Sequence, residues 1–449
     1  MITKVHTPPR AAYRQVDFLR DATLVVLLVY LLTGGLQRLI LGGSSGFGGG
    51  SALNQVMTFL VLGSAGLCVL YLRVPLRSML RGAEPFIIPV LLILISVMWS
   101  DYPSIGLRRA IRFVLELVGL VLLVSCYRES RSFLRALFVA FAILVVLDVL
   151  SFAIPRMSIT GIGVAGVHGH KNTLGSFAYA AIPIFFIAWR RRLIGNWSFV
   201  SLGLMLVTGL LLVASLSKTA MFLAAVSAIL AFMVYHVWRR GFTTQLAIGG
   251  LFSMFILLAA LPIASSGMNL GELVGLVTGD PTMTGRAEVW DYTFRRVGER
   301  FITGVGYGSF WDVDPSAVAL MNEQGVTFAF NQSHNGYIGV YAELGLLGVA
   351  AIVLMWVMAT APVLRRISNA REWPLVGYAL YTAIGYAFYN ITETSFFRVG
   401  FDTWIEYVII MVATAKLVAV QPAAPQQAPI KAKRVRRVYR MAPKHGIRP

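Results

Sequence analysis

Apolar runs of membrane-spanning length recur along almost the whole chain. A bilayer core takes about 20 apolar residues as an α-helix, and backbone groups in lipid must be hydrogen-bonded within their own segment. Of the 449 residues, 57% are hydrophobic and only 13% are charged, which is too little charge to cover the surface of ordinary soluble domains. The sequence therefore predicts an all-α fold, a polytopic bundle of membrane helices.

Twelve of these runs are long enough to be counted as transmembrane spans. They are residues 22–41, 52–72, 85–99, 110–126, 134–154, 173–189, 197–216, 220–238, 246–265, 337–359, 375–389 and 403–420. The domain organisation that follows has five parts. These are an N-terminal segment (1–21), spans one to nine (22–265), a large loop with an amphipathic helix (266–334), spans ten to twelve (335–420) and a basic tail (421–449) predicted to be disordered.

The placement of the cations predicts the orientation of these spans. The formal net charge is +19, and most Lys and Arg residues fall in alternate loops, which stay cytoplasmic under the positive-inside rule. Both termini are then cytoplasmic and the large loop lies outside. The first run lacks a small-residue cleavage pattern, which predicts an uncleaved anchor. The basic tail is expected to contact anionic lipid headgroups rather than nucleic acid.

Cations that remain on the outer side need another explanation, because topology disfavours them there. They are Arg38, Arg108, Arg109, Arg112, Arg156, Lys171, Lys218, Arg286, Arg295, Arg296, Arg300 and Arg398. Several lie at the mouths of predicted helices, where they could converge on one cavity and bind an anion. Lys218 sits in a very short turn and is expected to be buried among helix ends, with Asp402 as an alternative ion-pair partner.

The large loop contains a predicted helix. Trp290, Phe294, Val297 and Phe301 recur at helical spacing, and Arg286 lies one turn before Trp290 on the same stripe. This stripe is expected to face inward, although a membrane-interface helix with a snorkelling arginine explains the pattern equally well.

Three histidines lie in outer turns. His334 ends the large loop at the membrane boundary, where it could accept a proton or be structural. His168 and His170 precede the sixth span and could ligate a metal, with His334 as the one possible third outer histidine. Asp312 and Asp314 could also bind a metal, but a short acidic triplet before a proline is usually a turn.

Two charged features lie inside predicted spans. Asp148 is costly in a bilayer unless it is paired or protonated. Arg112 and Glu116 are one turn apart on the fourth span, so an intrahelical ion pair accounts for both.

Cys68 and Cys126 lie in apolar runs and offer neither a disulfide framework nor a cysteine-built zinc site.

Several of these motifs together resemble the O-antigen ligase and Wzy-type polysaccharide polymerase superfamily. They are Thr284-Gly285-Arg286 with Trp290, Gly304-Val305-Gly306-Tyr307-Gly308, His334-Asn335-Gly336-Tyr337 and Glu343-Leu344-Gly345-Leu346-Leu347-Gly348. Within it, the segments around Trp99-Ser100-Asp101, His170-Lys171-Asn172 and Ser217-Lys218-Thr219 are similar to the exopolysaccharide production polymerases known from rhizobia. The resemblance extends from about the third span to the end of the tenth.

The resemblance implies a membrane glycosyltransferase of the GT-C type that acts at the periplasmic face of the bacterial inner membrane. It implies donor and acceptor oligosaccharides linked to undecaprenyl diphosphate, and no metal or other cofactor. By position, Arg286 matches the family's loop arginine and His334 its histidine. Lys218 stands where many ligases have arginine, which keeps the charge but loses the bidentate fork.

The expected site therefore has a small set of members. His334 and Arg286 are expected to be catalytic; Lys218, Arg286, Lys171 and Arg109 to bind the diphosphate; and His170, Asn172, Asn335, Tyr337, Glu343 and Trp290 to support them. The lipid bilayer is a further partner, as are a chain-length regulator and a flippase of the same pathway.

Three functions remain open from the sequence. The first is a polymerase that extends lipid-linked repeat units, and the second is a ligase that transfers glycan to lipid A core. The third is a transporter, which predicts internal repeat symmetry and helices broken near the midplane; neither is evident in the sequence. The lysine-bearing turns favour the polymerase.

Overall fold

The computed structural model describes residues 10–34, 52–240, 286–311, 313, 332–368, 371–398 and 402–418. The α-helices are α1 (Arg10–Leu32), α3 (Ala52–Leu72), α4 (Leu76–Leu80), α5 (Glu84–Ser96), α6 (Pro103–Ser125), α7 (Ser130–Ser151), α8 (Pro155–Ser158), α9 (Lys171–Arg190), α10 (Val200–Ala214), α11 (Lys218–Trp238), α14 (Arg286–Val297), α16 (Gly336–Arg365), α17 (Trp373–Thr392) and α18 (Asp402–Leu417). Short 3₁₀ helices are η1 (Val97–Trp99), η2 (Gly166–His168), η3 (Gly195–Phe199) and η4 (Gly298–Arg300), and β1 (Ile159–Thr160) pairs with β2 (Gly163–Val164).

The described part of the chain is a helical membrane protein, as predicted, apart from the small β1–β2 hairpin. Six of its helices are long and apolar enough to cross a membrane: those covering Gln55–Leu72, Ser130–Ser151, Lys171–Arg190, Gly195–Ala214, Lys218–Trp238 and Gly336–Arg365. Each predicted span that falls on described residues overlaps a helix. The ninth span (246–265), most of the large loop and the basic tail lie outside these residues, so the count of twelve stays a prediction.

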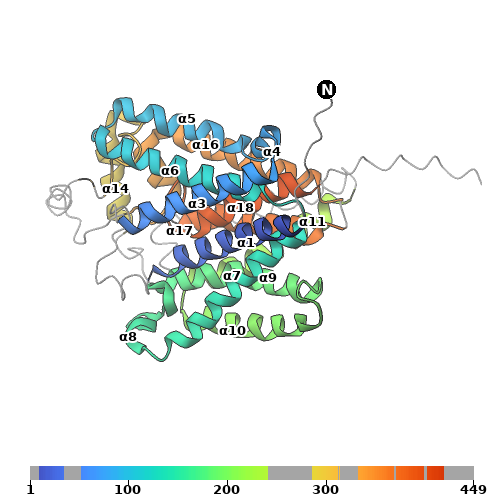
Figure 1. Cartoon of the computed structure of the whole chain (residues 1–449). Helices are drawn as coiled ribbons and strands as arrows, with labels where there is room; N and C mark the ends of the chain where they lie inside the picture. The colour runs from blue at the N-terminus through green and yellow to red at the C-terminus, as the bar shows by residue number, and fades with distance from the viewer. Residues whose placement is uncertain are drawn as a thin grey trace, which may run out of the picture.

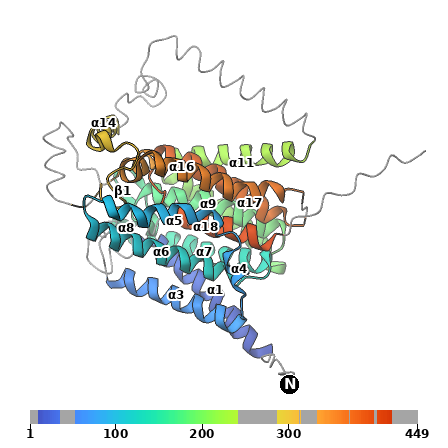
Figure 2. The same ribbon diagram turned by 90° about the horizontal axis from the view of Figure 1, so that it is seen from above.

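The long helices lie side by side in one bundle, with α14 running across one end (Figures 1 and 2). We call this the α14 end; the other end holds α4 and the beginning of α1. The loops predicted to be cytoplasmic meet at the second end. There Arg135 donates to the carbonyl of Leu193 (2.6 Å) and Arg191 to that of Arg371 (2.8 Å). The loops assigned to opposite sides by their charge are thus separated in space.

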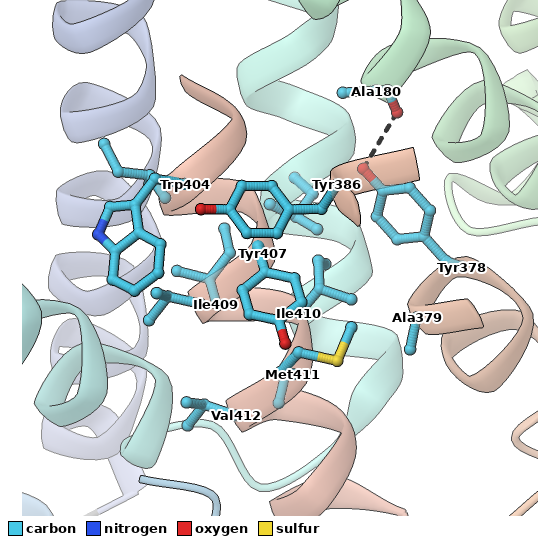
Figure 3. Close-up of a cluster of buried hydrophobic side chains, with 14 of the residues drawn as sticks. Ala180, Tyr378, Ala379, Tyr386, Trp404, Tyr407, Ile409, Ile410, Met411 and Val412 are labelled. Atoms are coloured by element: carbon cyan, nitrogen blue, oxygen red, sulfur yellow. Dashed lines mark hydrogen bonds between the residues drawn. The ribbon is translucent and has the colours of Figure 1, made fainter. Parts of the chain in front are cut away.

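Aromatic side chains from α17 and α18 fill the middle of the bundle (Figure 3). The rings of Tyr386 and Tyr407 are stacked with their centroids 4.4 Å apart, and the Tyr378 hydroxyl donates to the Ala180 carbonyl at 3.1 Å. The same hydroxyl is 2.7 Å from the buried carboxylate of Glu406. Hydrogen-bonded pairing of this kind is what a polar group in the bilayer interior requires.

Asp148 has its partners on the segment that precedes α9. Its carboxylate accepts from the Val167 N–H (3.0 Å) and contacts His168 Nε2 (3.2 Å), and both side chains are fully buried. Gly166 has a φ of +55°, and a Cβ there would lie 2.1 Å from the Asp148 Oδ1. Of the two alternatives that the sequence leaves open for Asp148, the structure shows the paired one. His168 was a possible metal ligand, but no group of three or more His, Cys, Asp or Glu side chains within the described residues could hold a metal ion.

Helix α16 is broken at Gly345, where φ is +63° and ψ is −158°. The gap is closed by residues 301–306 of the large loop. The Leu346 and Leu347 N–H groups donate to the carbonyls of Phe301 (2.9 Å) and Ile302 (3.2 Å). In return, the carbonyls of Ala342 and Glu343 accept from Val305 (3.1 Å) and Gly306 (2.9 Å). These four bonds replace those the helix loses, as a break at membrane depth requires.

We call these two paired segments the α16 joint. No broken helix was evident in the sequence, and the structure shows one at Gly345. By residue count the break lies roughly 13 Å along the helix from its start at Gly336, within the half nearer the α14 end.

Candidate functional site

Glu393, the residue that follows α17, joins three side chains from distant parts of the chain. Its Oε2 lies 3.2 Å from His334 Nδ1, and its Oε1 lies 2.9 Å from Asn172 Nδ2 and 3.9 Å from an Arg286 guanidinium nitrogen. Glu393 is only 7% exposed, whereas His334 and Arg286 are partly accessible. We call these four residues the Glu393 cluster. It lies at the α14 end and brings together both residues predicted to be catalytic.

The start of α16 fixes the position of His334. Asn335 is the N-cap, and its Oδ1 accepts from the N–H groups of Tyr337 and Ile338, each at 3.0 Å. The backbone therefore turns sharply just before the helix, and His334 takes a left-handed conformation with φ +49°. Gly336 permits close packing, because a Cβ there would lie 2.1 Å from the side chain of Asn390. Strain of this kind at an accessible histidine is typical of functional sites.

Asn172, in the first turn of α9, links the Glu393 cluster to the turn before α11. Its Oδ1 accepts from Ser217 Oγ (3.2 Å), and its backbone N–H donates to His170 Nδ1 (3.2 Å), so that His170 caps α9. A Cβ on Gly175 would lie 2.7 Å from that of Ala220, so the two helix starts pack closely. Both predicted lysines are next in sequence to this network, Lys171 beside Asn172 and Lys218 beside Ser217.

Lys218 itself is exposed, so the prediction that it is buried among helix ends is wrong. The tight turn buries Ser215 and Ser217 instead and directs the lysine outward. The side chain of its alternative partner, Asp402, lies outside the described residues. Lys171 is half-buried at the first position of α9.

Helix α14 delivers Arg286 to the Glu393 cluster from its first position. Trp290 donates from Nε1 to the Ser333 carbonyl at 2.8 Å, which ties α14 to the residue beside His334. The buried face includes Val289, Thr293 and Val297. Phe294 and Phe301 are 50% and 47% exposed, so the predicted inward stripe is rotated for these two residues. The sequence pattern misled because apolar residues near lipid need no protein partner.

Arg109 lies in a second cluster, under the glycine-rich segment. It donates to the carbonyls of Gly308 (2.6 Å) and Trp311 (2.8 Å), and thus holds that segment against α6. Nothing in these contacts brings it to the Glu393 cluster. Its role as a diphosphate ligand stays a prediction. In the structure, Arg109 supports the glycine-rich segment through these two hydrogen bonds.

Glu343 is also in this second cluster. It is 4% exposed and pairs with Arg398 at 3.5 Å. Burial and the nearby Glu343 carboxylate raise the pKa of Tyr307 well above its ordinary value, and the Tyr307 hydroxyl donates to the Phe397 carbonyl at 2.6 Å. Tyr307 is therefore a neutral structural group that supports the loop carrying residues 304–308.

The turn after η1 docks onto the same segment. Trp99 donates from Nε1 to the Thr303 carbonyl (3.1 Å), and Asp101 pairs with Arg300 (2.5 Å) and Arg296 (3.4 Å). The hydrogen bond to Asp101 raises the pKa of Arg300 further above its ordinary value. Two of the outer cations are thus neutralised by one carboxylate, while Arg286 shares its carboxylate with an imidazole. The other acidic pair considered, Asp312 and Asp314, lies outside the described residues.

Glu393 was not among the residues selected from the sequence. It follows an apolar helix, in Thr392-Glu393-Thr394-Ser395, without a flanking motif. One signal was available: an acid at the outer end of a predicted span, opposite an excess of outer cations, is a natural ion-pair partner.

The fold and the Glu393 cluster together define a multi-pass membrane protein with a histidine- and arginine-bearing site at one end of its bundle. Residues 202–353, which include Lys218, Arg286 and His334, match the sequence model of the O-antigen ligase family, Wzy_C. The resemblance to this family is thereby confirmed.

The chain is also similar to the exopolysaccharide production protein ExoQ of Rhizobium meliloti (strain 1021). The two are 25% identical over 290 residues. The alignment covers 62% of this chain and 65% of ExoQ. The chain thus spans 65% of the length of the curated relative that it matches.

Proposed function

We propose that this protein is a membrane glycosyltransferase that polymerises oligosaccharide repeat units carried by undecaprenyl diphosphate into exopolysaccharide. The reaction is placed at the periplasmic face of the inner membrane, with both termini cytoplasmic. The observation that carries the proposal is the Glu393 cluster, in which an accessible histidine and an arginine from two separate segments share one buried carboxylate. The similarity to ExoQ, an exopolysaccharide production protein, supports polymerisation into exopolysaccharide.

In this proposal His334 is the general base. An ionised carboxylate only accepts hydrogen bonds, so Glu393 fixes the proton of the neutral imidazole on Nδ1 and leaves Nε2 as the proton-accepting nitrogen. Nε2 takes the proton of the acceptor sugar hydroxyl while its oxygen attacks the anomeric carbon of the donor. Glu393 then stabilises the imidazolium, as the carboxylate of a catalytic triad does.

Arg286 stabilises the leaving group. As the bond between the anomeric carbon and the diphosphate oxygen breaks, negative charge develops on the diphosphate and must be neutralised in a site of low polarity. At 3.9 Å from Glu393, Arg286 is held without a close hydrogen bond and can turn to the diphosphate. Lys171 and Lys218, on the two helix starts joined through Asn172, would supply further positive charge.

The O-antigen ligase family match favours a second candidate, transfer of the glycan to lipid A core. The two functions use the same donor and leaving group and differ only in the acceptor. A transporter would also use broken helices, but the break in α16 is bonded closed by the large loop, so this feature does not favour transport.

The test is reconstitution of the full chain with lipid-linked repeat units. Growth of the glycan on the lipid supports the polymerase, transfer to added lipid A core supports the ligase, and movement across vesicles without a new glycosidic bond contradicts both. We expect Arg286→Ala and His334→Ala to abolish bond formation without loss of membrane insertion. Near-normal turnover in either variant would contradict the mechanism.

The stereochemistry gives a separate prediction. In this mechanism His334 is the base, and the Glu393 carboxylate is engaged by His334 and Asn172 rather than acting as a nucleophile, so a single displacement with inversion at the anomeric carbon is expected. Nuclear magnetic resonance of the product made from a donor of defined configuration measures this, and retention would rule out single displacement.

A further inference from the structure

The end of the bundle opposite the Glu393 cluster holds a second convergence of charge. Three arginine-bearing segments meet around the last turn of α18, which carries Lys416. A Cβ on Gly82, next to Arg81, would lie 2.9 Å from that of Ala415, so this turn packs directly on α18. Arg366 donates to the carbonyls of Val418 (2.6 Å) and Ala415 (2.8 Å). The third segment carries Arg128 just after α6, a helix that packs against α18.

Lys416 is half-buried among these cations. Arg128, Arg81 and Arg20 all lie within electrostatic range of it. Arg20 is only 4% exposed and is neutralised by Asp17 (2.6 Å) and Asp21 (2.8 Å), so these two acids are already engaged. Within the described ranges, Arg81, Arg128 and Lys416 form no ion pair with a carboxylate.

The other acids at this end do not neutralise the three cations. Glu84 accepts from the Gly82 N–H at 2.5 Å, and Glu372 accepts from the hydroxyl of Ser130. Glu129 is exposed beside Arg128 and makes no ion pair in the part of the chain that the structure describes. Lys416 is half-buried, and a partly desolvated cation without a carboxylate partner is costly. An anion from outside the chain that also contacts the exposed Arg81 and Arg128 would offset that cost.

We propose that Arg81, Arg128 and Lys416 bind the phosphate of an anionic phospholipid in the leaflet at this end of the bundle. Basic sites between helix ends at the cytoplasmic surface are suited to such headgroups. The short helix α4 offers an apolar surface that the acyl chains can contact. Its Leu76 and Leu80, next to Arg77 and Arg81, are 69% and 52% exposed. This assignment is independent of the proposed glycosyltransferase activity.

The experiment measures the thermal unfolding midpoint of the purified full chain in nanodiscs with increasing phosphatidylglycerol in phosphatidylcholine. We expect a saturable rise that weakens with added salt. Because a cation near a lipid surface is worth about 1 kcal/mol, each of Arg81→Gln, Arg128→Gln and Lys416→Gln should raise the half-saturating lipid fraction about fivefold. Arg81 and Arg128 are exposed, so their variants test the site even if Lys416→Gln fails to fold.

The matched control is Arg190→Gln, which removes an exposed cation from the end of α9 at the same end of the bundle. It should leave the half-saturating fraction unchanged. The proposed site would be overturned if Arg190→Gln raised the half-saturating fraction as much as the three variants do. It would also be overturned if the three variants responded to phosphatidylglycerol as wild type does, or if added phosphatidylcholine alone raised the midpoint equally. Millimolar inorganic phosphate giving the same stabilisation in pure phosphatidylcholine would overturn the assignment to a lipid.

Discussion

At the scale of single residues, the Glu393 carboxylate determines what the neighbouring groups can do. It contacts His334, Asn172 and Arg286 at once, although these come from the starts of three different helices. A buried carboxylate with two hydrogen bonds and one longer ion pair is held in one orientation, and it holds the imidazole in turn. His334 adds a backbone with φ +49°, and the Asn335 cap, the packing of Gly336 and the contact with Glu393 hold it in place.

Glu393→Gln tests this arrangement with almost no change of shape. The amide can no longer favour the imidazolium electrostatically, so glycosyl transfer should fall by about 10²- to 10⁴-fold while the protein still inserts and accumulates. The measurement is turnover of a lipid-linked repeat unit by equal amounts of purified variant and wild type.

The matched control for this variant is Glu299→Gln. Glu299 is exposed on η4, at the same end of the bundle. Its loss should leave turnover within about twofold of wild type, because surface substitutions away from such features have small effects. Wild-type turnover in Glu393→Gln would show that His334 works without the carboxylate.

At the scale of elements, the apolar runs predict the helices well and the joints between them poorly. The run 337–359 looks continuous in sequence, since Glu343-Leu344-Gly345-Leu346-Leu347-Gly348 contains no proline. The break at Gly345 depends on residues 301–306, which are some 40 residues away in sequence, and a local pattern carries no information on such a partner.

The site shows the same division. Local capping chemistry marks three helix starts, and these could be selected from the sequence. They are Ser217-Lys218, His170-Lys171 and Asn335. Glu393 could not, because its role comes from three contacts across the bundle. The sequence predicts Lys218 at the start of a helix, where the structure has it. Its exposure could not be predicted, because it depends on the burial of Ser215 and Ser217 in the turn.

Gly345→Ala tests the α16 joint. A Cβ there would lie 2.3 Å from the Ile302 carbonyl carbon, and a left-handed conformation alone costs a non-glycine residue about 1–3 kcal/mol. The variant should lower the thermal unfolding midpoint and make residues 301–306 accessible to added protease.

Gly203→Ala is the control for that variant. Gly203 lies in α10 with nothing within 4 Å of its Cβ position. The added methyl group should be neutral or stabilise the helix by about 0.5–1 kcal/mol. A midpoint for Gly345→Ala equal to that of this control would mean that the joint contributes nothing to stability.

At the scale of the whole molecule, the bundle has two chemically different ends. The α14 end carries the Glu393 cluster and the docked helix α14. The opposite end carries Arg81, Arg128 and Lys416, which form no ion pair with a carboxylate among the described residues. The sequence assigned the loops at these two ends to opposite sides by charge alone, and α14 and α4 lie at opposite ends of the bundle (Figure 1).

The orientation is tested on one helix, α11, whose ends carry exposed Lys218 and Arg239 roughly 31 Å apart. In intact cells with a permeable outer membrane, Lys218→Cys should react with a maleimide that does not cross the inner membrane. Arg239→Cys should react only after lysis. The native Cys68 and Cys126 are buried and serve as the unlabelled background. The reverse pattern would invert the proposed topology.

The α16 joint also restricts how this chain can vary in length. Residues 301–306 meet α16 in a fixed register, with each backbone group matched to one partner on either side of Gly345. One residue inserted or deleted there would shift every pairing by a step and leave amide groups unbonded next to lipid. Any change in loop length that the fold tolerates must therefore lie outside residues 301–306.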